Sequence, residues 1–503
     1  MKKIVAAAVS LGLLFTLPAL AQTVRNTDKF IKEESGSLIG ARIGVRAVRY
    51  DGKVIADVDG SGALLPASNT KLITTGCALN ALGSDFAMTT KLAMGGEVRD
   101  SVLHGDLYIV GGGDPTLGSK DSIALRIQTL FRTWASFLRK AGVKKIDGRI
   151  IGDGRFFDGP IECPTWDWED LGTYYGAGGG GLCFYRNQFD INVAVAGDSV
   201  ALKPSWPDLP WLDLRNEASV GPAGSGDNLY LFATDLSPVA SMRGTFASDR
   251  KAKTEECANK FGALTLAHEF RTYLETAGIL SEGYSDIDAR GRIRSFLEDS
   301  RPGECFFGKA LPVDSLRVIG STQSPSIKRI AYVTNHRSDN FYAETLLRTL
   351  GREKKGSASY ASALAAENEE LEALGLDTSH GIHVVDGSGL ARHNYIAPEF
   401  FCRFLRAMMD CKVFGDYLYT LGQPGKGSYS NRLKDAPDSV KSRIRYKSGS
   451  MNGVVCFSGY IEPSDGEKDH TIVFSVMTNN FTGPSWKAYS FIDKVIARLA
   501  GEN

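Results

Sequence analysis

The chain has 503 residues, and its 58 lysines and arginines equal its 58 aspartates and glutamates. A chain without net charge carries no global signal for nucleic acid or an anionic membrane surface, so we expect neither as a partner. The length predicts more than one domain, with enough apolar residues for substantial cores.

The N-terminus has the pattern of a targeting segment. Two lysines precede an apolar run over residues 4–20, and residues 19–21 (Ala-Leu-Ala) resemble a small-residue cleavage site. The sequence therefore predicts a signal peptide over residues 1–21 and a mature protein in the periplasm. No later segment reaches 18 uninterrupted apolar residues, so no transmembrane anchor is expected.

Eight cysteines lie in the predicted mature chain. An oxidising compartment permits disulfides, but spacing leaves their pairing open. Cys163 and Cys183 bracket a Trp- and Gly-rich loop and form the first candidate pair, whereas Cys77 and Cys456 lie in apolar contexts typical of reduced core residues. The sequence has no Cys-x-x-Cys and no His-Glu-x-x-His, so neither a metal nor a cofactor is predicted.

A β-hairpin precedes the first chemical motif. Residues 42–58 alternate in strand fashion around Asp51-Gly52, a two-residue turn signal. Pro66 and Ser68 then favour a helix start before an apolar-periodic run. Ser68 and Lys71 are three residues apart and project from one helical face, where a neutral lysine can take the serine proton.

A second Ser-x-x-Lys serves as an internal control for this motif. Ser248 and Lys251 have the same spacing, but a charged run follows them. No apolar face is present to bury the amine of Lys251 away from water, so we expect a solvated surface segment there.

The middle of the chain predicts a separate β-rich lobe. Glycines 111–113 lack the lysine of a phosphate-binding loop and are interpreted as a tight turn. An amphipathic helix is expected over residues 122–142, short strands fill residues 185–300, and a helix lies near residues 262–277.

Two further motifs follow in the second half of the chain. Ser338, Asp339 and Asn340 precede an amphipathic helix, where the hydroxyl of Ser338 relays a proton and the carboxamide of Asn340 holds a substrate amide. The plain alternative is that all three residues cap the helix. Lys447, Ser448 and Gly449 end a strand, where lysine and hydroxyl bind a carboxylate and glycine permits close approach. A lone Lys-Ser-Gly is more often a simple strand end, so the order of the three motifs carries the argument.

In this order the motifs resemble the signature of penicillin-recognising serine acyl enzymes. Longer segments are similar to class C low-molecular-mass penicillin-binding proteins, which are D-alanyl-D-alanine carboxypeptidases and endopeptidases. These segments are GDLYIVGGGDPTL, NFYAETLLR, VVDGSGLARHN and KSGSMNGVVCFSGYI. The resemblance implies an α/β transpeptidase-like domain, with an antiparallel sheet flanked by helices, over residues 22–96 and 313–503. Residues 97–312 are then a large two-lobed β-rich insertion.

The resemblance also implies the roles of the motif residues. Ser68 is the nucleophile and Lys71 its base, while Ser338 and Lys447 complete a proton relay and Asn340 contacts the substrate amide. The terminal carboxylate is held by Lys447 and Ser448. The oxyanion hole is formed by the backbone N–H groups of Ser68 and Ser450.

A side-chain pocket follows from the same resemblance. Asp170 and Tyr175 match the family's acidic and aromatic loop residues, and Arg392 and Asn452 match their partners. The pair Asp170 and Arg392 is expected to bind the ammonium and carboxylate of a diamino acid in the stem peptide. By composition alone, this Trp- and Tyr-rich loop is more typical of a local hydrophobic contact with a solvated aspartate.

The sequence therefore predicts a secreted serine D-alanyl-D-alanine carboxypeptidase, DD-endopeptidase or both, acting on peptidoglycan peptides and inhibited by β-lactams. A β-lactamase shares the motifs, but such chains are compact and lack a two-hundred-residue insertion. A non-catalytic penicillin-binding sensor or scaffold is the third alternative, and the intact motif residues argue against it. Oligomeric state, disulfide pairing and the role of the insertion stay open.

Overall fold

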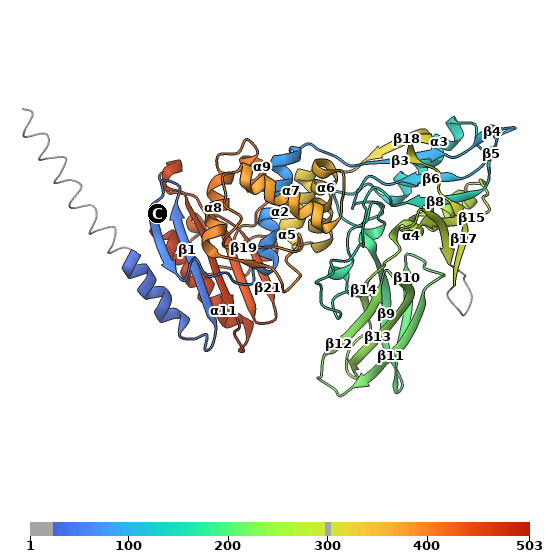
Figure 1. Ribbon diagram of the computed structural model, residues 1–503. Helices are drawn as coiled ribbons and strands as arrows, with labels where there is room; N and C mark the ends of the chain where they lie inside the picture. The colour runs from blue at the N-terminus through green and yellow to red at the C-terminus, as the bar shows by residue number, and fades with distance from the viewer. Residues whose placement is uncertain (1–23, 297–302, 503) are drawn as a thin grey trace, which may run out of the picture. The chain divides into compact units, whose positions relative to one another are not determined.

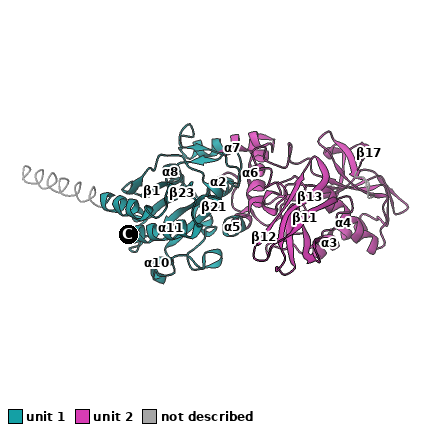
Figure 2. Ribbon diagram, turned by 90° about the horizontal axis from the view of Figure 1, so that it is seen from below, with its two compact units in different colours: residues 1–80, 332–338, 368–503 teal, residues 81–331, 339–367 magenta. Residues whose placement is uncertain are grey.

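The computed structural model describes residues 24–296 and 303–502 (Figure 1). The signal peptide predicted over residues 1–21 lies outside these residues. The described chain forms two compact units, coloured separately in Figure 2. Unit 1 comprises the described residues up to Asn80, Tyr332–Ser338 and the chain from Asn368; unit 2 comprises Ala81–Ala331 and Asp339–Glu367. No helix in the described ranges is long and apolar enough to cross a membrane.

Unit 1 is built on a five-stranded antiparallel sheet with the order β2-β1-β23-β22-β21. Its strands are β1 (Arg42–Arg49), β2 (Val54–Val58), β21 (Ile444–Met451), β22 (Val454–Ile461) and β23 (Ile472–Asn479). The predicted hairpin is confirmed as β1 and β2. In the turn between them Gly52 has a φ of +93°, a conformation that residues with a side chain rarely adopt.

Helices cover both faces of this sheet. Phe491 of α11 (Ser485–Ala500) shares a core with Val45 and Phe457 of the strands. On the opposite face, α8 (Pro398–Met408) packs on β1 and β23, where a Cβ on Gly44 would lie 2.9 Å from Pro398. Because Gly44 and Val45 are successive strand residues, they point to opposite faces. This is the predicted antiparallel sheet flanked by helices, and the α/β fold class is confirmed.

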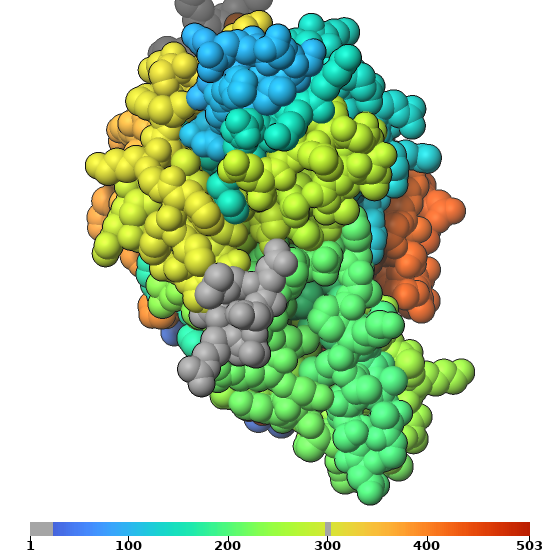
Figure 3. Space-filling view, turned by 90° about the vertical axis from the view of Figure 1, so that its right-hand side faces the viewer, coloured from blue at the N-terminus to red at the C-terminus, as the bar shows by residue number. Residues whose placement is uncertain are grey.

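Unit 2 contains two larger sheets. The seven-stranded sheet has the order β17-β16-β15-β8-β6-β3-β18 and the six-stranded sheet the order β12-β13-β11-β10-β9-β14. The first consists of β3 (Thr89–Met94), β6 (Leu107–Val110), β8 (Arg149–Asp153), β15 (Gly283–Ile287), β16 (Arg292–Phe296), β17 (Glu304–Lys309) and β18 (Arg317–Gln323). The second consists of β9 (Gln188–Ala196), β10 (Ser199–Trp206), β11 (Asp213–Gly221), β12 (Asp227–Thr234), β13 (Ser237–Ala247) and β14 (Lys253–Ala258). Figure 3 looks onto this unit, with the six-stranded sheet in green at the lower end.

One hydrophobic core joins the two sheets of unit 2. It includes Trp134 of α3 (Ile127–Lys140) and Phe270 of α4 (Gly262–Thr276), whose rings meet edge to face at 5.3 Å. Both helices were predicted from their periodicity. The β-rich content of the insertion is as expected, but its two sheets share one core, so residues 185–300 do not form a separate lobe. The insertion bounds of 97–312 stay a prediction.

The tight turn predicted at glycines 111–113 is wrong. The hydrogen-bonded turn follows at residues 115–118 instead, and within the glycine run the N–H of Gly113, which has a φ of +84°, donates to the carbonyl oxygen of Gly181 at 2.9 Å. A Cβ on Gly111 would overlap the same carbonyl of Gly181, and one on Gly112 would overlap that of Thr89. The glycines are needed because the segment passes between two neighbouring backbones.

The candidate disulfide between Cys163 and Cys183 is absent, and all eight cysteines, which lie in the described ranges, are reduced. Cys183 Sγ instead donates to the carbonyl oxygen of Gly180 within its own loop at 3.1 Å. The prediction of reduced core residues at Cys77 and Cys456 is confirmed, since both are completely buried.

Candidate active site

The first motif lies where a short 3-10 turn runs into a long helix. The turn is η1 (Ala67–Thr70), with Pro66 as its N-cap, and α2 (Lys71–Leu82) follows without a break. In this geometry Lys71 Nζ donates a hydrogen bond to Ser68 Oγ at 2.9 Å. An amine in contact with a serine hydroxyl is the arrangement in which a base removes the serine proton.

A second acceptor holds the completely buried amine of Lys71. Its Nζ donates to the backbone carbonyl of Ser388 at 2.6 Å. The buried carboxylate of Asp386 orders this loop by accepting from the N–H of Gly389 at 2.8 Å. Gly389 has a φ of +79° and lies against the carbonyl of Ala67, where no side chain fits. Sequence reasoning missed Asp386 and Ser388, although their segment carried part of the family resemblance.

A second lysine–serine pair lies in the same unit. Lys447 Nζ donates to Ser338 Oγ at 2.9 Å and to the carbonyl oxygen of Ser448 at 2.5 Å. Burial, together with the nearby charge of Lys71, lowers the pKa of the Lys447 amine well below 10.5. The structure therefore brings Ser68, Lys71, Ser338 and Lys447 together around two adjacent amines.

The outer edge of β21 presents its backbone at alternate residues. Tyr446 exchanges both backbone hydrogen bonds with Gly422, and the N–H of Ser448 donates to the phenol oxygen of Tyr429 at 3.2 Å. Both N–H groups therefore point away from β22. Because this direction repeats at every second residue of an antiparallel pair, the N–H and C=O of Ser450 face the same edge. An extended peptide can pair with a strand edge of this kind.

Gly449 lets this strand lie directly against the first motif. A Cβ on Gly449 would lie 2.5 Å from the carbonyl oxygen of Pro66 and 2.9 Å from the backbone nitrogen of Ser68. The N–H groups of Ser68 and Ser450 thus belong to two touching segments. Two convergent backbone donors beside a nucleophile are what an oxyanion hole requires.

Tyr429 is a site residue that sequence reasoning missed. Its phenol oxygen lies 3.1 Å from Ser448 Oγ and also accepts the N–H of that residue. Burial raises the pKa of the Tyr429 phenol, so the hydroxyl keeps its proton and can donate. The sequence offered no signal, because Tyr429 lies in a short turn, η5 (Gly427–Tyr429), outside every motif.

The remainder of the second motif belongs to unit 2. Asp339 is the N-cap of α6 (Asn340–Lys355) and accepts the N–H of Tyr342 at 2.9 Å, so the capping alternative holds for this one residue. Asn340 Nδ2 donates to the backbone carbonyl of Tyr175 at 3.1 Å. Asp339 also forms an ion pair with Arg186. Two loops of unit 2 therefore hold the residues that follow Ser338.

A sequence model of the D-Ala-D-Ala carboxypeptidase 3 (S13) family matches residues 24–288 and 306–499. The chain belongs to this family. It is 27% identical to a D-alanyl-D-alanine carboxypeptidase of Actinomadura sp. (strain R39), over 97% of this chain and 89% of the relative. It is 24% identical to D-alanyl-D-alanine carboxypeptidase DacB of Haemophilus influenzae, over 93% of this chain and 92% of the relative.

The fold is also that of a solved relative. The structure of penicillin-binding protein 4 from Haemophilus influenzae superposes with a TM-score of 0.77 and 22% identity, covering 93% of this chain and 99% of the other. The family resemblance drawn from the three motifs is therefore confirmed. As a member of the S13 family, the protein is a hydrolase of the D-Ala-D-Ala carboxypeptidase type.

Two of the four residues predicted for a side-chain pocket belong to unit 2 and two belong to unit 1. In unit 2, burial and the nearby carboxylate of Asp170 raise the pKa of the Tyr175 phenol. In unit 1, Arg392 Nη2 donates to the carbonyl oxygen of Asn452 at 3.3 Å. The role of these four residues in binding a substrate stays a prediction.

Two further observations concern the control motif and the side chains that can bind metal ions. Ser248 follows β13 and is exposed, as is Lys251, so the solvated segment predicted there is confirmed. Within residues 24–296 and 303–502, no group of three or more His, Cys, Asp or Glu side chains is arranged to hold a metal ion.

Proposed function

We propose that this S13-family protein is a serine D-alanyl-D-alanine carboxypeptidase and DD-endopeptidase that acts on peptidoglycan stem peptides through an acyl-enzyme on Ser68. The observation that carries the proposal is the pair of 2.9 Å hydrogen bonds, from Lys71 to Ser68 and from Lys447 to Ser338. Each links a buried amine to a serine hydroxyl, which is the chemistry that nucleophile activation and proton relay need.

Acylation begins when neutral Lys71 takes the proton of Ser68 and the oxygen attacks the carbonyl of the penultimate D-alanine. The backbone N–H groups of Ser68 and Ser450 stabilise the oxyanion, each worth about 3 kcal/mol in the transition state. The peptide C–N bond then breaks, and the leaving amine receives a proton through Ser338 and Lys447. Water hydrolyses the ester and regenerates Ser68. The lowered pKa of Lys447 supports this relay, because it keeps the two adjacent amines from both being charged.

The third motif holds the substrate in this proposal. Lys447 and Ser448 bind the terminal carboxylate, and Asn340 contacts the substrate amide. Gly449 leaves room for the peptide beside β21. The hydrogen bonds of Tyr429 to Ser448 support this role, since they fix the hydroxyl that meets the carboxylate.

The substrate is a stem peptide with a diamino acid at its third position. Asp170 pairs with the side-chain ammonium of that residue and Arg392 with its carboxylate, while Tyr175 and Asn452 line the same pocket. This assignment rests on the family's pattern and on the opposite charges of the two residues.

The setting of the reaction is part of the proposal. The signal peptide over residues 1–21 directs the protein to the periplasm, where residues 22–96 and 313–503 form the transpeptidase-like domain around the insertion at 97–312. Penicillin acylates Ser68 and inhibits the enzyme. A structure of Haemophilus influenzae penicillin-binding protein 4 in complex with a β-lactam, with a TM-score of 0.71, supports β-lactam binding.

Mass analysis of products tests the proposed function. The purified protein is incubated with a diaminopimelate-containing pentapeptide and separately with a cross-linked peptide dimer. We expect loss of one terminal D-alanine from the pentapeptide and conversion of the dimer to two monomers. Cleavage of neither peptide with rapid hydrolysis of penicillin would indicate a β-lactamase, and stable acylation without turnover of any peptide would indicate a sensor.

A further inference from the structure

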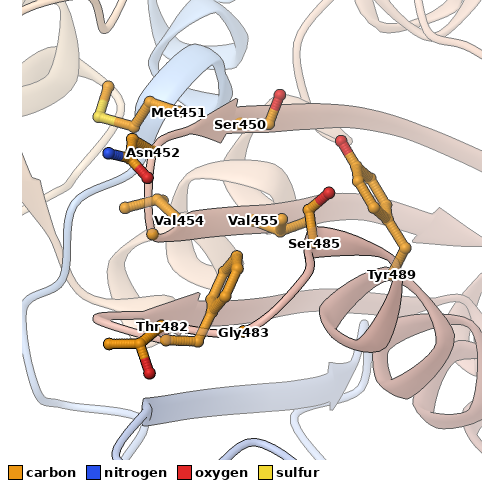
Figure 4. Close-up of a pocket in the computed structure, with 11 residues that line it drawn as sticks. Ser450, Met451, Asn452, Val454, Val455, Thr482, Gly483, Ser485 and Tyr489 are labelled. Atoms are coloured by element: carbon orange, nitrogen blue, oxygen red, sulfur yellow. The ribbon is translucent and has the colours of Figure 1, made fainter. Parts of the chain in front are cut away.

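A pocket of about 430 Å³ opens beside Ser450 in unit 1 (Figure 4). It lies between the tip of the β21–β22 hairpin and the start of α11. Its lining residues are Ser450, Met451, Asn452, Gly453, Val454, Val455, Phe481, Thr482, Gly483, Ser485 and Tyr489. A cavity of this size falls within the range of small-ligand sites.

Hydroxyl groups gather around this pocket. They belong to Ser450, Thr482, Ser485 and Tyr489, and among the residues that the structure describes none of these side-chain oxygens hydrogen-bonds another protein group. The buried Phe481 supplies an apolar contribution to the lining. Because the lining offers hydroxyl donors beside an apolar ring, the pocket suits a ligand with hydrogen-bond acceptor groups on a short apolar stem.

The direction of β21 assigns the pocket to one side of the scissile bond. In the proposed function, Lys447 and Ser448 hold the terminal carboxylate, and Ser450 faces the reacting carbonyl. The leaving group therefore lies toward Lys447, and the acyl part of the substrate lies toward Met451 and Asn452. The pocket begins at Ser450 and continues to the hairpin tip, so it lies on the acyl side.

One contact connects the pocket with the proposed site for the diamino acid. Arg392 Nη2 donates to the carbonyl oxygen of Asn452, and Asn452 lines the pocket. Arg392 is proposed to hold the far end of the diamino acid's side chain, so this contact places the pocket beside the residue that carries that side chain. The residue that precedes the diamino acid is the next group on the acyl side. In stem peptides that preceding residue is D-glutamate, joined through its side-chain carboxyl and carrying a free α-carboxylate.

We infer that the pocket beside Ser450 binds the γ-linked D-glutamate of the stem peptide. This inference rests on the proposed function and names a further part of its substrate. The α-carboxylate accepts hydrogen bonds from the hydroxyls of Ser485 and Tyr489, which lie close together in Figure 4, while the methylene groups contact Phe481. The enzyme then recognises D-glutamate in the stem peptide in addition to the terminal D-alanyl-D-alanine.

Two substrates of different length test this inference. The short one is N-acetylated diaminopimelyl-D-alanyl-D-alanine, and the long one adds L-alanyl-γ-D-glutamate at its amino end. We expect wild-type protein to have a kcat/KM about tenfold higher for the long substrate, the effect of one or two added hydrogen bonds. Ser485→Trp fills the pocket and should bring the ratio close to one, and Ser485→Ala should lower it by a smaller factor.

Ser439→Trp is the matched control. Ser439 is an exposed serine in the first turn of α10 (Asp438–Lys441), which also follows a proline, and it lies outside the pocket. This variant should keep the wild-type ratio. Equal kcat/KM for both substrates in wild-type protein, or an unchanged ratio in a folded Ser485→Trp protein, overturns the inference while leaving the peptidase intact. Absence of cleavage of either substrate overturns the proposed function itself.

Discussion

Arg186 forms a buried ion pair with Asp339, the residue that separates Ser338 from Asn340 in the chain. Asp339 is almost completely buried, and it also caps α6. Arg186 reaches it from a stretch in which Tyr185, Arg186 and Asn187 all have positive φ values, of 51°, 58° and 51°. Three successive left-handed residues without a glycine are costly, so the surrounding packing must hold them. The guanidinium of Arg186 thus holds Asp339 in place at the N-terminus of α6.

Arg186→Met should weaken both stability and acylation. It leaves the buried carboxylate of Asp339 without its counter-charge, which typically costs about 3–5 kcal/mol. We expect a lower free energy of unfolding by urea and slower acylation by penicillin. A double variant with Asp339→Asn should recover part of both losses, because it removes the uncompensated charge. Additive effects of the two substitutions would show that the pair does not act as a unit.

Ser68→Ala should abolish covalent labelling by penicillin. The leaving group of a β-lactam stays attached to the acyl-enzyme, so labelling reports the nucleophile directly. Ser248→Ala is the matched control, since this serine has the same spacing to a lysine but is exposed. We expect mass spectrometry to find one adduct in Ser248→Ala and none in Ser68→Ala. An adduct that persists in Ser68→Ala would assign the nucleophile elsewhere.

Lys71→Arg should lose acylation although it keeps the charge. A guanidinium does not deprotonate under these conditions and cannot accept the serine proton. It is also longer and planar, and would have to replace contacts with both Ser68 and the carbonyl of Ser388. We expect the rate of acylation to fall by at least about a hundredfold, within the contribution of general base catalysis. Acylation near the wild-type rate would mean that another group is the base.

The sequence predicted those helices and strands whose pattern lies within a few neighbouring residues. The hairpin around Asp51-Gly52 and the helices α3, α4 and α6 follow from strand alternation, turn chemistry and helical periodicity. The contact of Ser68 with Lys71 follows from a spacing of three residues. In each case the residues that determine the structure are neighbours in the chain.

The features that the sequence analysis missed depend on contacts between residues that are far apart in the chain. Lys71 meets Ser388 across 317 positions, and Tyr429 acts on Ser448 from a turn that belongs to no motif. The glycines at 111–113 were misinterpreted because the backbones they pass, at Thr89 and Gly181, are remote in sequence. Such contacts are made by tertiary packing, which single-sequence periodicity does not record.

Lys447→Met should change how stability depends on pH. The folded state lowers the pKa of this amine from 10.5, so between that lowered value and 10.5 the unfolded chain binds more protons than the folded one. The contribution of Lys447 to the free energy of unfolding therefore rises with pH across this window and is lowest below it. We expect the stability of wild-type protein relative to Lys447→Met to increase as the pH rises toward 10.5, measured by urea unfolding at several pH values.

The exposed Lys434 provides the control for this pH series. Lys434→Met should follow the wild-type pH dependence, because it leaves the buried amine of Lys447 and its surroundings unchanged. A stability difference between wild type and Lys447→Met that stays constant or falls with rising pH would contradict a depressed pKa. Loss of peptidase activity in Lys447→Met is expected in either case.

Asp170→Ala and Arg392→Ala should slow the turnover of diaminopimelate-containing peptides more than acylation by penicillin. Each removes one charge proposed to pair with the zwitterionic end of the diamino acid, and a hydrogen bond to a charged group contributes about 1.5–3 kcal/mol. We therefore expect kcat/KM for the peptide to fall by roughly 10- to 100-fold. Penicillin lacks that side chain, so its acylation rate measures whether the fold and the serine are intact. Equal losses on both substrates would show that the two residues support the fold. If wild-type protein cleaves lysine-containing stem peptides equally well, the side-chain carboxylate of the diamino acid is not recognised.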